Sequence, residues 1–408
     1  MSLKSSTSES IDIDSIDDDR PADEFLVTLE DEVSPVLSVV LPTLNEEEGI
    51  AECIGRIKTA VKTLQVPTEI IVSDSSTDRT PDIAEALGAS VVRPDKPGYG
   101  YAYRYAFRQT RGDYIVMGDA DTTYDFEQIP RLLEHLQQED ADMILGSRLN
   151  GEIKPGAMPA LHQYIGNPSL TAFLNLFYDA GVSDAHSGFR IFTRDAYEQM
   201  ELQTTGMEFA SEMIMDAGAR ELDIVEEPIV YHEREGEETL DSFKDGWRHM
   251  RFMLLNAPGY LFSAPGVTLA GFGVFIMTIA ATGVDFAGIS LGTNSMIAGS
   301  LFAISGYQIF TFGLFATVGS DPIRQPEDPI TKTLSRWLSL ERGSVIGFVV
   351  LLAGGLYATS LVATWVTTGF SSVPVTAASL LSFTAIVLGI QTVFSAFFLS
   401  AVAEERPC

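Results

Sequence analysis

The sequence predicts an α/β domain built on a doubly wound, mostly parallel sheet, followed by an all-α transmembrane domain of four helices. Two observations carry this prediction. Over residues 36–145, short apolar runs alternate with helical patterns, which is typical of parallel strands joined by crossover helices. Beyond Arg251, charged residues are absent from three long stretches, and about 20 apolar residues are enough to cross a bilayer.

The first half of the predicted sheet begins with a continuous apolar run at 36–41, which ends at Pro42 and is typical of a buried strand. Apolar residues then recur on one face of a helix, at Ile50, Ile54, Ile57 and Val61. The next expected elements are a strand, a helix and a short strand, at 69–73, 81–87 and 90–92.

The second half contains the stretch around which the domain is organised. A helix is expected from Gly98-Tyr99-Gly100 through Arg111, and residues 113–117 form the fourth strand. That strand leads directly into Gly118-Asp119-Ala120-Asp121. A helix at 127–138 and a fifth strand at 142–145 follow, and the strand is expected to end in Gly146-Ser147-Arg148.

Polar clusters follow the predicted strands at the points where they end. They are the segment from Pro42 to Glu46, Asp74, the pair Asp119 and Asp121, and Arg148. In open α/β sheets, ligands bind outside the carboxyl ends of the strands, so these clusters are expected to converge. A dinucleotide-binding Rossmann site is a competing interpretation, but it requires G-x-G-x-x-G after the first strand, where this chain has Pro-Thr-Leu-Asn-Glu.

Asp119 and Asp121 point the same way if the strand geometry continues, because side chains alternate along a strand. Two like charges held together raise a pKa or recruit a cation, and Mg²⁺ typically takes one or two carboxylates plus substrate phosphates. A solvated acidic turn is the alternative interpretation of the pair taken by itself.

The composition is strongly acidic, with 26 Lys and Arg against 56 Asp and Glu. Such a surface argues against nucleic acid as a partner and is typical of a salt-rich cytoplasm, where the charge is screened. The two cysteines, Cys53 and Cys408, are too few for a disulfide framework or a metal cluster. Cys53 falls in a helical pattern and is expected to be a small residue of the hydrophobic core.

The domain boundaries follow from composition. Residues 1–34 are expected to be a disordered acidic tail, 35–245 the α/β domain, 246–261 an amphipathic juxtamembrane helix, and 262–408 the membrane domain. Four spans are predicted near 262–284, 294–319, 343–367 and 375–402. Lys and Arg concentrate in the loop 320–342, which places the α/β domain and the C-terminus in the cytoplasm and makes the chain a multi-pass protein of the cell membrane. No ionisable residue lies inside a span, which favours an anchor or lipid platform over a transporter.

These residues resemble the motifs of family 2 glycosyltransferases of the GT-A fold, and more closely those of the polyprenyl-phosphate (dolichyl-phosphate) glucose and mannose synthases. The resemblance covers about residues 36–260. The acidic composition indicates a haloarchaeal member, and the four trailing helices resemble those of the membrane-anchored branch. Six motifs carry it in order: Leu41-Pro42-Thr43-Leu44-Asn45-Glu46, Ile70 to Asp78, Gly98-Tyr99-Gly100, Gly118-Asp119-Ala120-Asp121, Gly146-Ser147-Arg148, and Asp184-Ala185-His186-Ser187-Gly188-Phe189-Arg190.

The resemblance implies a role for each motif. The residues expected to contact the nucleotide sugar are Pro42, Leu44, Asn45, Glu46, Asp74, Gly98, Gly100, Asp119, Ala120 and Asp121. Asp119 and Asp121 would hold Mg²⁺ or Mn²⁺ against its diphosphate. The residues expected to bind the acceptor phosphate are Arg148, Arg190, Ser169 and Arg234. Asp119, Asp121, Arg148, Asp184 and Arg190 form the expected catalytic set, in which Asp184 either acts as a base or positions substrate.

The implied reaction is the inverting transfer of a hexose to dolichyl or polyprenyl phosphate at the cytoplasmic face, supplying lipid-linked sugar for protein or surface glycosylation. Glucose from UDP-glucose is favoured, with mannose from GDP-mannose next. The nucleophile is an anionic phosphate oxygen, which needs a cation to bring it beside another anion more than it needs a base. A planar Arg provides this better than Lys.

Three departures from the family pattern bear on the site. Asp74 is followed by Ser75 where many relatives carry a second aspartate. Thr123 stands where some relatives have a Gln metal ligand. Thr239 stands where a basic loop residue is expected, and Arg234 is a substitute.

Two interpretations compete with this reaction. A processive polysaccharide synthase would carry Q-x-x-R-W before a pore helix, but the nearest string, Thr333 to Trp337, lacks the Gln. A non-catalytic lipid-carrier flippase or scaffold would not need the intact Asp119 and Asp121 pair. Two segments, 161–178 and 247–262, suit helices at a membrane interface, although core packing explains the first equally well. The sequence leaves the oligomeric state open.

Overall fold

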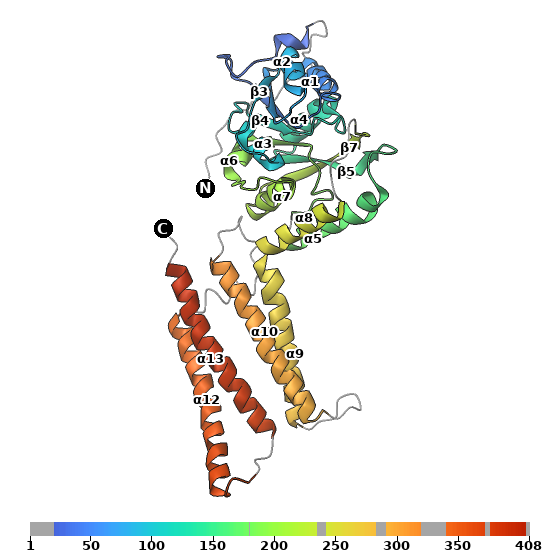
Figure 1. The fold of residues 1–408 in the computed structure, drawn as a ribbon. Helices are drawn as coiled ribbons and strands as arrows, with labels where there is room; N and C mark the ends of the chain where they lie inside the picture. The colour runs from blue at the N-terminus through green and yellow to red at the C-terminus, as the bar shows by residue number, and fades with distance from the viewer. Residues whose placement is uncertain are drawn as a thin grey trace. The chain divides into compact units, whose positions relative to one another are not determined.

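The structure is a computed structural model, and it describes residues 20–178, 180–234, 242–282, 291–319, 340–371 and 376–404. The chain divides into two compact units, Met1–Met253 and Leu254–Cys408. The first unit contains an α/β sheet and the second contains long apolar helices (Figure 1). The acidic tail up to residue 19, the loop position Thr239, and most of the basic loop 320–342 with its Thr333 to Trp337 string lie outside the described residues.

A single seven-stranded sheet organises the first unit, in the order β3-β2-β1-β4-β6-β5-β7. The strands are β1 (Leu37–Thr43), β2 (Thr68–Asp74), β3 (Ser90–Val92), β4 (Tyr114–Met117), β5 (Met143–Ile153), β6 (Arg190–Thr193) and β7 (Ile224–Tyr231). All neighbours pair in parallel except β6, which is antiparallel to both β4 and β5. The mostly parallel α/β sheet predicted from the sequence is therefore confirmed.

Helices lie on both faces of the sheet. One layer comprises α1 (Ile50–Leu64), α2 (Thr80–Ala86) and α4 (Ile129–Gln138), with the 3-10 turn η3 (Phe126–Gln128) before α4. The other comprises α3 (Tyr99–Phe107), α5 (Asn167–Tyr178), α6 (Arg194–Gln199) and α7 (Phe209–Ala219). A π-helical turn, η4 (His162–Gly166), precedes α5, and the boundary between the two units falls within α8 (Ser242–Asn256).

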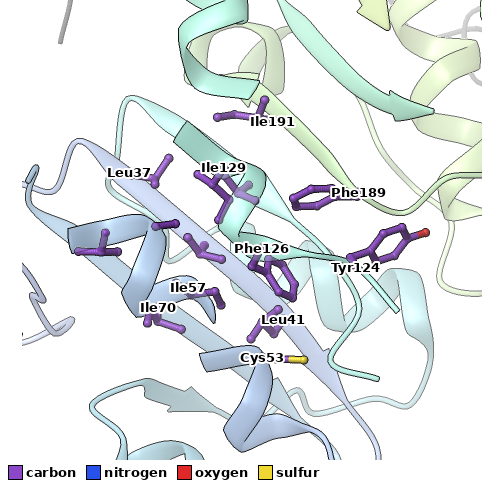
Figure 2. Close-up of a cluster of buried hydrophobic side chains, with 14 of the residues drawn as sticks. Leu37, Leu41, Cys53, Ile57, Ile70, Tyr124, Phe126, Ile129, Phe189 and Ile191 are labelled. Carbon is purple, nitrogen blue, oxygen red and sulfur yellow. The ribbon is translucent and has the colours of Figure 1, made fainter. Parts of the chain in front are cut away.

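The main core lies between the sheet and the layer of α1 and α4. Figure 2 shows alternate residues of the strands, Leu37 and Leu41 among them, packed against side chains of these helices and of η3. The predicted apolar face of α1 is wholly buried, at Ile50, Ile54, Ile57 and Val61. Cys53 is also buried there, and burial raises the pKa of its thiol to about 12, as suits a small core residue.

Two segments differ from the sequence prediction. Residues 20–34 were expected in a disordered tail, but Phe25 and Val27 are buried, and Leu26 forms a parallel bridge with Thr68 beside β2. Apolar residues in an otherwise acidic stretch therefore add to the sheet edge. β5 was expected to end before Arg148, but it continues to Ile153 past an irregularity between Ser147 and Glu152.

Among the described residues of the second unit, four helices are long and apolar enough to cross a membrane: Gly259–Thr282, Thr293–Thr317, Leu340–Thr367 and Ala377–Ala401. They correspond to η5 (Gly259–Ser263) with α9 (Ala264–Thr282), and to α10 (Thr293–Gly319), α12 (Leu340–Thr367) and α13 (Ala377–Glu404). The backbones of α9 and α10 approach closely, since a Cβ on Gly273 would lie 2.4 Å from the nitrogen of Ala303. The prediction of four helices able to cross a membrane is therefore confirmed.

Candidate active site

The loops after β1 and β2 meet at the carboxyl edge of the sheet, as the parallel arrangement predicts. Thr43 and Asp74 are register partners at the ends of the two strands, and Thr43 Oγ1 donates to Asp74 Oδ1 at 2.8 Å. Asp74 is buried, Pro42 is partly buried, and Leu44 is exposed on the loop. The structure therefore brings the first two predicted nucleotide-binding motifs together.

Asn45 and Glu46 tie these two loops through their backbone. The N–H of Asn45 donates to Ser76 Oγ at 2.8 Å, and the N–H of Glu46 donates to Thr80 Oγ1 at 2.9 Å. Asn45 has a φ of 59°, a left-handed conformation that Asn tolerates, and its Oδ1 accepts from the N–H of Thr77 at 2.9 Å. Asn45 thus shapes the loop, and its contact with a nucleotide stays a prediction.

One carboxylate oxygen of Asp119 accepts hydrogen bonds from two tyrosine hydroxyls. Tyr99 Oη donates to Asp119 Oδ1 at 2.8 Å, and Tyr103 Oη lies 3.4 Å from the same oxygen. Burial, together with the nearby charge of Asp121, raises the pKa of Asp119 to about 6. The two tyrosines lie one turn apart on α3 and therefore share a face, so this helix fixes the orientation of the carboxylate.

Asp121 lies in a cluster of three carboxylates and one guanidinium. Thr123 Oγ1 donates to Asp121 Oδ1 at 2.6 Å. Arg234 donates from Nη2 to Glu46 Oε1 at 2.8 Å, and its Nε lies 3.7 Å from Asp121 Oδ2. Burial raises the pKa of Glu46 to about 7, with Asp121 and Asp119 adding to the rise and Arg234 opposing it. Arg234 therefore contacts the predicted donor and metal residues, although it was expected among the acceptor residues.

The carboxylates of Asp119 and Asp121 fit a divalent cation by their chemistry, since Mg²⁺ and Mn²⁺ prefer oxygen ligands. Nowhere in the described part of the chain do three His, Cys, Asp or Glu side chains form a group able to hold a metal ion. A cation here would thus take further ligands from water and the donor's phosphates. Thr123, at the position of a possible ligand, binds Asp121 instead, and Ala120 is buried between the two aspartates.

Arg148 and Asp184 form a buried, bidentate ion pair. Arg148 Nε donates to Asp184 Oδ2 and Nη2 to Oδ1, both at 2.8 Å, and the backbone N–H of Arg148 donates to Oδ2 at 3.0 Å. Burial favours the neutral acid, but Arg148 outweighs it and holds the pKa of Asp184 below its ordinary value. Such a carboxylate orients the guanidinium and is a weak base.

Tyr124 joins the segment of Asp184 to the aspartate loop. Its hydroxyl accepts from the backbone N–H of Gly188 at 2.7 Å, and its ring stacks on Phe189 with centroids 5.5 Å apart. Tyr231 packs against Tyr124, with ring centroids 5.4 Å apart, and its ring lies 5.3 Å from Arg148 Cζ. The sixth motif is therefore fixed against the fourth and fifth.

Arg190 begins β6, an interior strand between β4 and β5, and is fully buried. Its Nε donates to the carbonyl of Ser187 at 3.0 Å and its Nη2 to that of Ala185 at 3.1 Å. Burial lowers the pKa of Arg190 to about 10, so it remains charged at neutral pH. Arg190 thus supports the turn 185–187 from within, and direct contact with an acceptor phosphate would require that turn to move.

Gly98 and Gly100 are enclosed by the segment before α7. A Cβ on Gly98 would lie 2.2 Å from the carbonyl oxygen of Thr205, and one on Gly100 would lie 2.7 Å from Phe209 Cβ. Gly98 also has a φ of 130°, which favours glycine. Helix packing therefore explains both glycines, and their contact with a nucleotide stays a prediction.

Ser169 is exposed on α5, and in the described residues no hydrogen bond or ion pair joins it to the rest of the predicted site. The segment 161–178 carries both buried and exposed apolar side chains. Leu174 and Phe177 are buried, whereas the exposed apolar side chains are Leu161, Tyr164, Ile165 and Leu176. Core packing thus explains part of this segment, and its membrane contact stays a prediction.

The sequence analysis assigned no role to several residues that the structure places in the site. Tyr99 and Tyr103 orient Asp119, Tyr124 anchors Gly188, and Glu226 binds the segment that carries Asp184. The tyrosines share a helix face at a spacing of four residues, which is a detectable signal. Glu226 follows no motif, and only the pairing of β5 with β7 brings it to the site.

Comparison with known proteins agrees with this geometry. Residues 38–200 match the glycosyl transferase family 2, and residues 318–403 match the glycosyltransferase family 2 C-terminal transmembrane region. The low-salt glycan biosynthesis hexosyltransferase Agl6 of Haloferax volcanii is 56% identical, over 94% of this chain and 92% of that protein.

Two further relatives each match about half of the chain. The dolichyl-phosphate hexose transferase of Haloferax volcanii is 32% identical over 52% of this chain and 89% of its own length. The undecaprenyl-phosphate mannosyltransferase of Micrococcus luteus is 31% identical over 48% of this chain and 83% of its own length. The motifs, the sheet and these matches together show that the chain belongs to glycosyltransferase family 2 and is a membrane protein of that family.

Proposed function

We propose that this glycosyltransferase moves a hexose from a nucleotide-diphosphate sugar to dolichyl or another polyprenyl phosphate, with inversion at the anomeric carbon. The observation that carries the proposal is the juxtaposition of opposite charges at one edge of the sheet. Burial and the nearby carboxylate of Asp121 raise the pKa of Asp119, and the charge of Arg148 lowers it. Arg148 is paired with Asp184, and its guanidinium lies 5.3 Å from the ring of Tyr231, which packs against Tyr124.

The relatives support a lipid phosphate as the acceptor. Two of them are named for dolichyl-phosphate and undecaprenyl-phosphate sugar transfer, and the relative that spans nearly the whole chain is named a hexosyltransferase. The four apolar helices supply a reason for a membrane-borne acceptor, because a polyprenyl chain partitions into the same bilayer.

The reaction is a single displacement. A phosphate oxygen of the acceptor forms a bond to the anomeric carbon while the bond to the donor's diphosphate breaks, and the nucleoside diphosphate leaves with both electrons. A divalent cation bound by Asp119 and Asp121 would neutralise charge on that leaving group. Tyr99 and Tyr103 hold Asp119 in place for this role.

Arg148 is the residue that we assign to the acceptor phosphate. Its Nε and Nη2 each donate a hydrogen bond to Asp184, so in our proposal the acceptor phosphate is bound through the N–H groups that these two bonds do not use. Asp184 positions this guanidinium and is not a base in our proposal, since the nucleophile is already anionic at neutral pH.

We assign the donor sugar, the side of the membrane and the use of the product from the sequence. Glucose from UDP-glucose is the favoured donor sugar and mannose from GDP-mannose the next. The Lys and Arg residues of the loop 320–342 favour a cytoplasmic active site, and the product would serve as a lipid-linked sugar for protein or surface glycosylation.

A donor panel tests the proposal. The full chain in detergent is incubated with dolichyl phosphate, Mn²⁺ and radiolabelled UDP-glucose or GDP-mannose, and label is counted in the lipid extract. We expect one donor to label an acid-labile glycosyl phosphate lipid. Label that enters a polymer would contradict the proposal and favour a processive synthase, and no label from any nucleotide sugar would favour a non-catalytic role.

A further inference from the structure

We propose that Glu226 is a positioning residue for the acceptor: it fixes the backbone of residues 183–184 so that Asp184 orients Arg148. This inference rests on the proposed role of Arg148 in binding the acceptor phosphate. Glu226 belongs to none of the six motifs and lies on β7, far along the chain from Asp184.

One carboxylate oxygen of Glu226 accepts three hydrogen bonds from consecutive residues. Its Oε1 lies 2.8 Å from the backbone nitrogen of Ser183, 3.0 Å from Ser183 Oγ and 3.1 Å from the backbone nitrogen of Asp184. All three donors are at least partly buried, and hydrogen bonds to a charged acceptor are stronger than neutral ones. Glu226 therefore fixes both the position and the direction of this peptide.

The same segment also contacts β5. Ser183 Oγ lies 2.7 Å from Ser147 Oγ, directly before Arg148, and Leu145 of β5 is paired with Glu226 of β7. Residues of two paired strands, Ser147 of β5 and Glu226 of β7, thus bond to the same segment. Any displacement of that peptide moves the Asp184 carboxylate relative to the Arg148 guanidinium.

The hydrogen bonds form a continuous chain to the acceptor site. Glu226 holds the N–H of Asp184, and the carboxylate of Asp184 in turn accepts three bonds from Arg148, at 2.8, 2.8 and 3.0 Å. The guanidinium has a single orientation only while Asp184 stays in place. Glu226 therefore acts on acceptor binding through Asp184, without touching the substrate.

Glu227 provides a matched control on the same strand. Neighbouring residues of a strand point to opposite faces, and Glu227 contacts His135 Nδ1 at 2.7 Å and Arg131 Nη1 at 3.5 Å. It is the same residue type on the same strand and also contacts polar side chains, but these belong to α4 and not to the segment of Asp184. Loss of Glu227 therefore reports on general effects of removing a carboxylate from β7.

The test measures transfer by the full chain in detergent, with dolichyl phosphate or the nucleotide sugar varied in turn. We expect Glu226→Ala to raise the KM for dolichyl phosphate by about tenfold or more, because small displacements of binding groups are costly. The KM for the nucleotide sugar should stay unchanged. Glu226→Gln should restore most of the acceptor affinity, since its amide oxygen can accept the same bonds, and Glu227→Ala should leave both KM values unchanged.

The outcomes separate this inference from the proposed function. An unchanged acceptor KM in Arg148→Ala, or no transfer by the wild type, would overturn the assignment of Arg148 and with it this inference. A raised KM in Arg148→Ala with an unchanged KM in Glu226→Ala would overturn the role of Glu226 alone. If Glu226→Ala does not fold, Glu226→Asp is used instead, because its shorter side chain moves the carboxylate away from residues 183–184 and keeps the charge. An acceptor KM equal to that of the wild type in Glu226→Asp would also overturn the role of Glu226.

Discussion

The guanidinium of Arg148 and the carboxylate of Asp184 are joined by two parallel hydrogen bonds of 2.8 Å in a buried setting. A pair of this kind has two consequences. It gives Arg148 one orientation at the end of the regular part of β5, and it makes each partner dependent on the other, because an unpaired buried charge is costly.

Removing one partner of this pair should destabilise the protein more than removing both. We expect Asp184→Ala to cost about 3–5 kcal/mol of unfolding free energy, because Arg148 is left buried and unpaired. A double variant, Arg148→Met with Asp184→Leu, should recover much of that loss. Denaturant unfolding of the full chain in detergent measures both, and a double variant as unstable as Asp184→Ala would contradict the account.

Arg234 should compete with a metal ion for the carboxylates of Glu46 and Asp121. Its guanidinium lies 2.8 Å from Glu46 Oε1 and 3.7 Å from Asp121 Oδ2, and neutralises part of this cluster. Arg234→Gln should therefore lower the melting temperature without metal and enlarge the increase caused by Mn²⁺ alone. Arg131→Gln, which removes an arginine at α4, is the control. An equal Mn²⁺ effect in the wild type and Arg234→Gln would speak against competition.

Gly100 should not tolerate a side chain. A Cβ there would lie 2.7 Å from Phe209 Cβ and 2.9 Å from the carbonyl oxygen of Thr204, and overpacking of this kind costs about 1–3 kcal/mol. Gly100→Ala should also reduce transfer, because it displaces the helix whose tyrosines hold Asp119. Gly55→Ala is the control: its Cβ would meet nothing within 4 Å, and it should stabilise α1 by about 1 kcal/mol. Equal melting temperatures for the two variants would refute this explanation.

His186 should make the fold sensitive to mild acid. Burial, reinforced by His249 with its ring centroid 4.9 Å away, lowers the pKa of His186 from 6.5 to about 3. Below pH 6.5 the unfolded chain binds a proton at this residue that the folded chain excludes, so stability is complete above that pH and declines as the pH falls.

The melting temperature of His186→Gln should accordingly fall less than that of the wild type between neutral and mildly acidic pH. Gln can still bond to Ser211, the residue that lies 3.2 Å from His186 Nε2. His162→Gln, outside this cluster, should behave as the wild type does. Identical pH dependence in the wild type and His186→Gln would show that another group titrates.

Much of the sheet could be predicted because its signals are local. Continuous apolar runs, helical periodicity on α1 and polar residues after each strand place Asp74, Asp119 and Asp121 at one edge without any tertiary information. The spans are equally local, since length and the absence of charge suffice.

The remaining features depend on contacts between distant segments. β6 runs antiparallel because the segment before it already lies at the carboxyl edge, where Tyr124 binds Gly188. The burial of Arg190 follows from that strand's central place, and Arg234 meets Glu46 only through the fold. No spacing in the sequence encodes these contacts; the acceptor roles of Arg190 and Arg234 come from the family resemblance and stay predictions.

The central claim is that the carboxylates of Asp119 and Asp121 serve metal-assisted transfer to a lipid phosphate, and one measurement tests it most directly. Radiolabelled sugar entering dolichyl phosphate is compared for the wild type, Asp119→Asn and Asp121→Asn, with and without excess chelator, after circular dichroism shows that each variant is folded. The account predicts that chelator or either substitution abolishes transfer. Full transfer by a folded Asp119→Asn variant in excess chelator would contradict it.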